Sequence, residues 1–113
     1  MEKNSIKYEI GAKQFDCPVA LSSYVINGKW KLQIINQLSF NKKMRYSALK
    51  SEIENVSEKM LIQHLRELES DGLIHRKVYP VVPPMVEYSL TKAGQDFIPV
   101  IIALRAWGEQ FQK

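Results

Sequence analysis

Polar side chains that can bind a polyanion recur at helical spacing in the middle of the chain. At about 100° per residue, Lys59, Gln63, Arg66 and Ser70 lie on one face of a helix. Ammonium, guanidinium, amide and hydroxyl groups are the donors that proteins direct at phosphates and at the edges of bases. Met60 lies on the flank of this face, where an apolar side chain can contact a thymine methyl group. The face is therefore a candidate DNA-binding surface.

The residues around this face carry the signals of a complete amphipathic helix. Ser57 is a favourable N-cap, and Glu58 suits the positive end of the helix dipole. Gly72 can adopt the left-handed conformation in which helices often end. The side opposite the polar face is a buried stripe formed by Leu61, Leu65 and Leu68.

A solvated surface helix would carry the same charges, with Lys59 and Arg66 paired to Glu67 and Glu69. The residues after the helix favour the DNA-binding interpretation. Two segments rich in β-branched, aromatic and aliphatic residues flank a proline-rich turn there, which predicts a β-hairpin. The segments are residues 73–79 and 86–90. A hairpin directly after an amphipathic helix is typical of a winged helix-turn-helix, in which the hairpin forms the wing.

Positive charge is concentrated around the predicted helix and wing. Arg76 and Lys77 lie on the first strand of the wing, and a basic connector upstream ends in Arg45. Residues 29–77 contain ten Lys/Arg and six Asp/Glu, so the net charge of +4 of the whole chain comes from this segment. Such an asymmetry attracts a polyanion over a long range.

The whole chain predicts a mainly α fold with a small β-hairpin, an α+β winged helix-turn-helix with an additional C-terminal helix. Residues 1–16 are polar with scattered apolar positions and predict an N-terminal arm. Residues 17–113 are expected to form one domain, because a chain of 113 residues can bury one modest core. Further helices are expected over residues 18–26, 30–38 and 46–53, with a tight turn at 54–56.

The segment after Thr91 has more apolar surface than a helix that merely covers a small domain needs. Thr91 can cap a helix over about residues 92–113, and Pro99 is expected to kink it. The helix either folds back on its own core or forms a two-fold interface, and its broad apolar surface favours a homodimer. The candidate dimerisation residues are Phe97, Ile98, Ile101, Ile102, Leu104 and Trp107.

Composition argues against several other classes of protein. A single cysteine, Cys17, excludes an internal disulfide framework and fits a reducing compartment. No apolar run approaches the length of a membrane span and no signal-peptide pattern opens the chain, so we expect a cytoplasmic protein without a membrane partner. His64 and His75 lack acidic residues at ligand spacing, and no glycine loop could hold a phosphate. We therefore expect no metal, no cofactor and no enzymatic activity.

Several short motifs occur in one order along the chain. They are Cys17-Pro18-Val19, Gly28-Lys29-Trp30, Ser57-x-Lys59-Met60-Leu61, the runs from Leu65 to Leu73 and from Tyr79 to Thr91, and Ala106-Trp107-Gly108. In this order they resemble the HxlR-type transcriptional regulators, which are relatives of the MarR group. The resemblance covers about residues 17–110 and implies a dimeric winged helix-turn-helix that binds a palindromic operator, often as a repressor and in some members as an activator.

The resemblance also implies roles for individual residues. Residues 76–86 match the wing, and five positions match the recognition helix: Ser57, Lys59, Met60, Gln63 and Arg66. Two residues depart from the pattern. Met85 stands where the wing often has a basic residue, and His64 stands where an arginine is common.

In some relatives the cysteine that matches Cys17 senses oxidants or electrophiles, which leaves a small-molecule or oxidant effector open. Asp16 disfavours the thiolate, and no second cysteine exists to resolve an oxidised thiol. A disulfide between the Cys17 residues of two subunits, or an adduct, remains open beside a buried structural thiol at a helix start.

We interpret the chain as a homodimeric regulator that binds double-stranded DNA in a sequence-specific way. The alternative is a winged-helix module that binds a protein through the apolar wing tip, Val81-Val82, and does not bind DNA.

Overall fold

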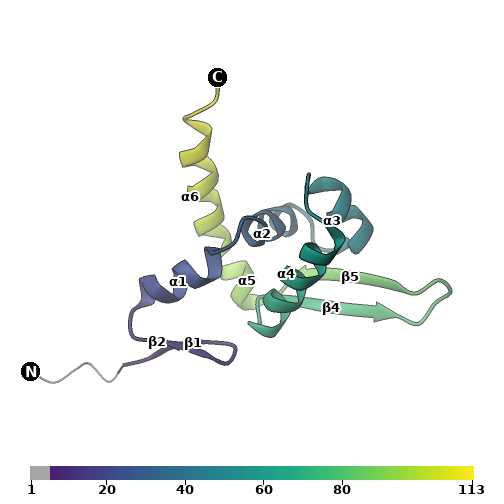
Figure 1. The fold of residues 1–113 in the computed structure, drawn as a ribbon, viewed down its shortest axis with the longest axis horizontal. Helices are drawn as coiled ribbons and strands as arrows, with labels where there is room; N and C mark the ends of the chain where they lie inside the picture. Colours follow the sequence, from purple (N-terminus) through teal and green to yellow (C-terminus); the bar gives the residue numbers. More distant parts are fainter. Residues whose placement is uncertain (1–5) are drawn as a thin grey trace, which may run out of the picture.

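The computed structural model describes residues 6–113, which fold around one core (Figure 1). Residues 1–5 of the expected arm lie outside the described residues. The elements, in chain order, are β1 (Tyr8–Ile10), β2 (Lys13–Phe15), α1 (Pro18–Ile26), α2 (Lys31–Phe40), β3 (Met44–Arg45), α3 (Tyr46–Glu52), α4 (Glu58–Ser70), β4 (Ile74–Tyr79), β5 (Met85–Leu90), α5 (Lys92–Asp96) and α6 (Ile98–Glu109).

Part of the expected N-terminal arm is an antiparallel hairpin, β1–β2, in which Tyr8 pairs with Phe15. Gly11 turns the chain between the strands with a φ of 56°, a left-handed conformation that glycine adopts without a steric penalty. A Cβ atom on Gly11 would lie 2.8 Å from Oδ1 of Asp71, the residue that follows α4. The turn of the hairpin therefore approaches the C-terminal end of α4.

Helices α3 and α4 form the predicted helix-turn-helix. Asn55 lies in the turn between them with a φ of 65°, a region that asparagine tolerates better than most residues. The hydroxyl of Ser57 accepts the N–H of Met60 at 3.1 Å and caps α4. The chain leaves α4 at Gly72, which has a φ of 77°. Both predicted ends of the helix are confirmed.

The wing consists of β4 and β5, which extend beyond the helices (Figure 1). A third strand, β3, was not expected, because the basic connector has too few residues to show a strand pattern. It pairs with β5 through Met44 opposite Tyr88 and Arg45 opposite Glu87, so the strand order is β3-β5-β4.

Thr91 closes the wing at its base. Its hydroxyl donates a hydrogen bond of 2.6 Å to the carbonyl of Gly72, and its N–H donates one of 3.1 Å to the carbonyl of Leu73. The same hydroxyl accepts the N–H of Gly94 and caps α5, as the sequence predicted. The two ends of the wing therefore meet at one residue.

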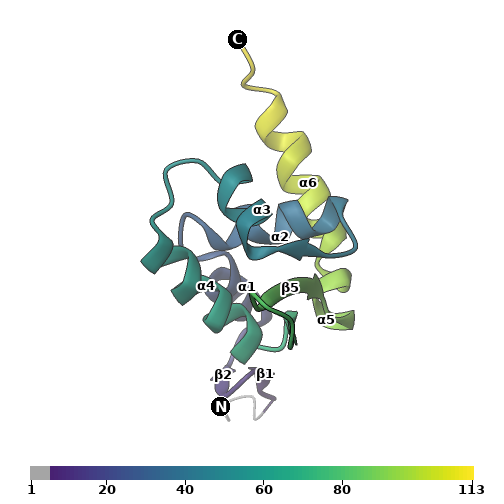
Figure 2. The same ribbon diagram turned by 90° about the vertical axis from the view of Figure 1, so that its right-hand side faces the viewer.

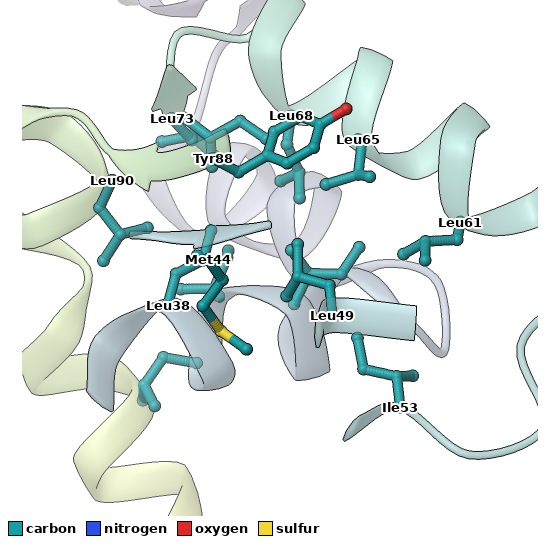
Figure 3. Close-up of a cluster of buried hydrophobic side chains, with 14 of the residues drawn as sticks. Leu38, Met44, Leu49, Ile53, Leu61, Leu65, Leu68, Leu73, Tyr88 and Leu90 are labelled. Atoms are coloured by element: carbon teal, nitrogen blue, oxygen red, sulfur yellow. The ribbon is translucent and has the colours of Figure 1, made fainter. Parts of the chain in front are cut away.

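The core lies where α2, α3, α4 and the base of the wing meet (Figure 3). Ile34 and Ile35 of α2, Leu49 of α3 and Leu61 of α4 have no exposed surface. Burial of each such side chain is worth about 1.5–3 kcal/mol. The helix expected from residue 30 begins at Lys31 instead, with a half-buried Trp30 at its N-cap.

The C-terminal segment differs from the single kinked helix that we expected. It consists of two helices, α5 and α6, which meet at Phe97. Pro99 lies in the first turn of α6, where the missing N–H leaves no hydrogen bond unmade. Helix α6 projects from the body, with the C-terminus at its far end (Figure 2). None of the helices between residues 6 and 113 has the length and apolar character to cross a membrane.

Candidate DNA interface

Helix α4 separates its polar and apolar side chains as the sequence predicted. Leu61, Leu65 and Leu68 point into the core and are at most 2% exposed. The exposed candidate residues are Ser57, Lys59, Gln63 and Arg66, and Met60 is half-buried beside them. The helix therefore presents hydrogen-bond donors and positive charge along its outer side.

The cations of this face do not form the ion pairs of an ordinary solvated helix. Within residues 6–113, neither Lys59 nor Arg66 has a carboxylate oxygen within 4.0 Å of its charged nitrogens. Glu67 instead pairs with Lys31 and His64, and Glu69 with Arg76 of the wing. The pairing expected under the solvated-helix interpretation is therefore wrong.

The other candidate cations divide between the two faces of the wing sheet. Arg76 lies opposite Tyr88 and faces α4, with its Nε 3.6 Å from Oε1 of Glu69. Arg45 and Lys77 both lie opposite Glu87 of β5, and successive side chains of a strand point to opposite faces. Arg45 and Lys77 thus share the face that Arg76 does not occupy. Arg76 and Arg66 line the same groove, whereas Arg45 and Lys77 do not line it.

That groove lies between α4 and the wing and has a volume of about 400 Å³. Its apolar side chains include Ile62, Leu65 and Val86. Two arginines, Arg66 and Arg76, and two glutamates, Glu58 and Glu69, line it as well. The sequence did not predict the groove, because its lining comes from α3, α4, β4 and β5, which only the fold brings together.

Two tyrosines complete the lining of the groove. Burial raises the pKa of the Tyr88 hydroxyl, which lies near the charges of Arg76, Glu69 and Arg66. Figure 3 shows the Tyr88 ring beside α4, close to Leu65. Burial, followed by the charge of Glu58, raises the pKa of Tyr46. The Tyr46 hydroxyl is buried and has no hydrogen-bond partner among the described residues. Both tyrosines are therefore neutral near pH 7.

The N-terminal hairpin and α1 hold the C-terminal end of α4. Asp71, which is 6% exposed, accepts a hydrogen bond of 2.7 Å from the Tyr24 hydroxyl. Lys13 of the hairpin lies over the Tyr24 ring, 4.9 Å from its centroid, and 4.0 Å from Asp71. Hydrogen bonding to Tyr24 raises the pKa of Lys13, and burial raises that of Tyr24.

A second set of contacts fixes the same turn of α4 to α2. Lys31, although only 5% exposed, places its Nζ 3.7 Å from Glu67. His64 contacts Glu67 through Nδ1 at 3.1 Å and is 8% exposed. His64, which departs from the family pattern, is therefore a buried polar residue of α4 that contacts Glu67 on the same helix. His75 is a strand residue of β4, as predicted.

Cys17 is exposed at the N-cap of α1 and makes no capping hydrogen bond through its side chain. The interpretation as a buried structural thiol is therefore wrong. The preceding Asp16 forms an exposed ion pair with Lys7, so Lys7 offsets the negative charge next to the thiol. Among the described residues, no group of three His, Cys, Asp or Glu side chains could hold a metal ion.

The candidate dimerisation residues fall into two sets. Ile101 is 3% exposed and belongs to the core, and Phe97 and Ile98 pack against it. The prediction that Ile101 contributes to the dimer interface is therefore wrong, because its side chain is already buried within one subunit. The second set is exposed on α6: Ile102 (51%), Leu104 (39%) and Trp107 (64%).

Arg105 anchors α6 to α2. Its Nη2 donates a hydrogen bond of 2.8 Å to Oδ1 of Asn36, and its guanidinium lies 4.4 Å from the centroid of the Phe40 ring. These contacts fix the side of α6 that faces the domain, and leave Ile102 and Trp107 exposed.

The chain is similar to known helix-turn-helix regulators in sequence and in structure. Residues 25–113 match the model of the HxlR-like helix-turn-helix family. A relative from Methanothermobacter thermautotrophicus, described as an uncharacterised HTH-type transcriptional regulator, is 42% identical over 103 residues, which are 91% of this chain and 78% of the relative. A solved structure described as a MarR-family regulator from Porphyromonas gingivalis W83 is 45% identical, with a TM-score of 0.80 over 85% of this chain and 93% of that one. The oxidised form of the redox regulator HypR is 39% identical, with a TM-score of 0.79 over 86% and 99%.

Proposed function

Because the chain belongs to the HxlR-like helix-turn-helix family and is a DNA-binding transcriptional regulator of that type, we propose that it is a homodimeric repressor of a palindromic operator. The observation that carries the proposal is the outer face of α4. Lys59, Gln63 and Arg66 are exposed there, and neither cation is paired to a carboxylate within residues 6–113. Such a face can donate to base edges in the major groove, where each base pair presents a distinct pattern.

The proposed homodimer uses the exposed side of α6. A second copy of the chain would bury the exposed side chains of Ile102, Leu104 and Trp107. It would also bury Phe111, whose ring centroid lies 4.9 Å from that of Trp107. To read one operator, the two-fold axis of the proposed dimer must place both copies of α4 on one side. Copies that enter successive major grooves lie about 34–36 Å apart, so the operator should contain two inverted half-sites about one helical turn apart.

Selection from a pool of random duplexes by the purified protein tests this proposal. The expected product is a set of duplexes with two inverted half-sites, and footprinting should protect both. Their affinity should fall steeply with salt concentration, because each phosphate contact releases counterions. Selection of no common sequence would contradict the proposal. It would favour a protein-interaction module that uses Val81 and Val82 at the wing tip, which are 51% and 99% exposed.

A redox function for Cys17 is the second candidate. The observation that favours it is the exposed thiol at the start of α1, in a chain that is similar to a redox regulator. Two Cys17 thiols of a dimer would form one disulfide and give up two protons and two electrons to an oxidant. Mild oxidant should then change the DNA affinity of the wild type but not of Cys17→Ser, and a non-reducing gel should reveal linked subunits. Identical responses of the two proteins would exclude this function.

A further inference from the structure

The groove between α4 and the wing has a geometric relationship to DNA. In a B-DNA duplex, one sugar–phosphate strand separates the major groove from the adjacent minor groove. A helix in the major groove and a wing beside it must straddle that strand. The strand would therefore pass along the groove that Arg66 and Arg76 line from its two sides.

The charges in this groove are not arranged as a simple cationic channel. Arg66 has no carboxylate partner within the described residues, whereas Nε of Arg76 lies 3.6 Å from Oε1 of Glu69. The side chains of Arg76 and Glu69 are 44% and 42% exposed, so both ends of this ion pair are open to an incoming ligand. Glu69 is on the recognition helix and Arg76 is on the wing, so the pair bridges the groove.

We propose that this groove seats backbone phosphates of DNA and that Glu69 is a counter-ion of Arg76 which a phosphate displaces. The inference rests on the proposed function, since it requires α4 to enter the major groove. A phosphate oxygen and the Glu69 carboxylate compete for the same guanidinium donors. Phosphate and guanidinium pair with good geometry, so a phosphate can replace the Glu69 carboxylate as the ionic partner of Arg76.

Glu69 therefore lowers the affinity of the protein for DNA. Its pair with Arg76 must break when the phosphate arrives, and its negative charge then remains beside the strand. In the free protein, the same pair holds the guanidinium in the groove in place of a phosphate. Glu69 is thus a residue that tunes affinity without donating a hydrogen bond to DNA.

The substitution Glu69→Gln tests the inference, because glutamine keeps the shape of the side chain and removes its charge. Glu9→Gln on β1 is the matched control, since it changes the net charge equally at an exposed side chain outside both the groove and α6. The probe is a duplex that the wild-type protein has selected from the random pool. We expect Glu69→Gln to bind it about threefold to fivefold more tightly than Glu9→Gln does near 0.1 M salt.

A double-mutant cycle with Arg76→Ala assigns the effect to the ion pair. If Glu69 acts through Arg76, the additional gain of Glu69→Gln disappears in the Arg76→Ala background. Equal affinities of Glu69→Gln and Glu9→Gln would overturn the inference, and so would a gain that persists without Arg76. Thermal unfolding confirms that each variant is folded. Failure of the wild type to select any duplex would instead contradict the proposed function.

Discussion

The hydroxyl of Tyr24 donates a hydrogen bond of 2.7 Å to Oδ2 of Asp71 and so joins α1 to the C-terminal end of α4. The two residues are 47 positions apart in the chain. Asp71 is almost fully buried, and Lys13 of the N-terminal hairpin offsets its charge from 4.0 Å. The orientation of α4 therefore depends on α1 and on the N-terminal hairpin, which hold its C-terminal end.

The substitution Tyr24→Phe should destabilise the protein by about 1–3 kcal/mol, because it leaves a buried carboxylate oxygen without its donor. Urea denaturation would measure the loss as a lower midpoint with an unchanged slope. Tyr8→Phe in the hairpin is the control for loss of a tyrosine hydroxyl elsewhere. An unchanged midpoint for Tyr24→Phe would show that water replaces the hydroxyl at Asp71.

The substitution Tyr46→Phe, in contrast to Tyr24→Phe, should not destabilise the protein. Its hydroxyl is buried without a partner among the described residues, so removal of the hydroxyl relieves a desolvation cost instead of breaking a hydrogen bond. We expect a stability equal to that of the wild type or up to about 1 kcal/mol higher. The same denaturation experiment tests this, and a large loss would reveal a partner that the hydroxyl acquires in solution.

Stability should fall in alkali through three tyrosines. Burial raises the pKa values of Tyr24, Tyr46 and Tyr88 above the ordinary value of 10.0. Between the unfolded and the raised pKa, the folded state binds more protons, so stability that is complete below about pH 10 decreases as the pH rises. Absorbance of tyrosinate should show late ionisation in the folded protein. Tyr88→Phe should weaken the pH dependence of the urea midpoint.

The substitution Arg66→Ala should weaken DNA binding without unfolding the domain, since Arg66 lies opposite the buried leucines. Loss of a base contact would relax specificity at one position by about 1–3 kcal/mol, and loss of a phosphate contact would lower the salt slope by about one. Lys59→Ala should behave similarly. Lys92→Ala on α5 is the control with the same change of charge. Wild-type affinity for both α4 variants would remove α4 as the DNA-reading element.

The two faces of α6 should respond differently to substitution. Ile102→Glu places a charge on the exposed side and should give a folded monomer by sedimentation, with DNA affinity sharply reduced because the half-sites are read separately. Ile101→Ala opens a cavity in the core and should cost about 2–5 kcal/mol of stability. A dimeric Ile102→Glu protein would move the interface to another surface.

The sequence predicted the elements that depend on local signals. Ser57, Gly72 and Thr91 mark helix ends through their own hydrogen bonds and backbone conformations, which the neighbouring residues do not change. Strand β3 and hairpin β1–β2 escaped prediction because such short strands depend on pairing. Pro99 was misread because a proline in a first turn and a proline at a kink have the same local pattern.

The candidate site could be predicted only where one face of one element forms it. The outer face of α4 follows from periodicity alone. The pairs Tyr24–Asp71 and Glu69–Arg76 depend on which elements pack together, and no spacing in the sequence indicates them. The burial of His64 could not be predicted from the sequence either. A polar residue at the edge of a helix face can be buried when a neighbour such as Glu67 forms a hydrogen bond with its ring.

The hydrogen bonds from Thr91 to Gly72 and Leu73 determine where the chain can accept insertions. Since the wing leaves and rejoins the domain at one point, its tip is a separate loop closed at the base. Doubling the length of a flexible loop adds only about 0.6 kcal/mol of closure entropy. Insertions between Tyr79 and Met85 should therefore leave the recognition helix in place. The tip of the wing can therefore vary in length and sequence while the rest of the fold stays the same.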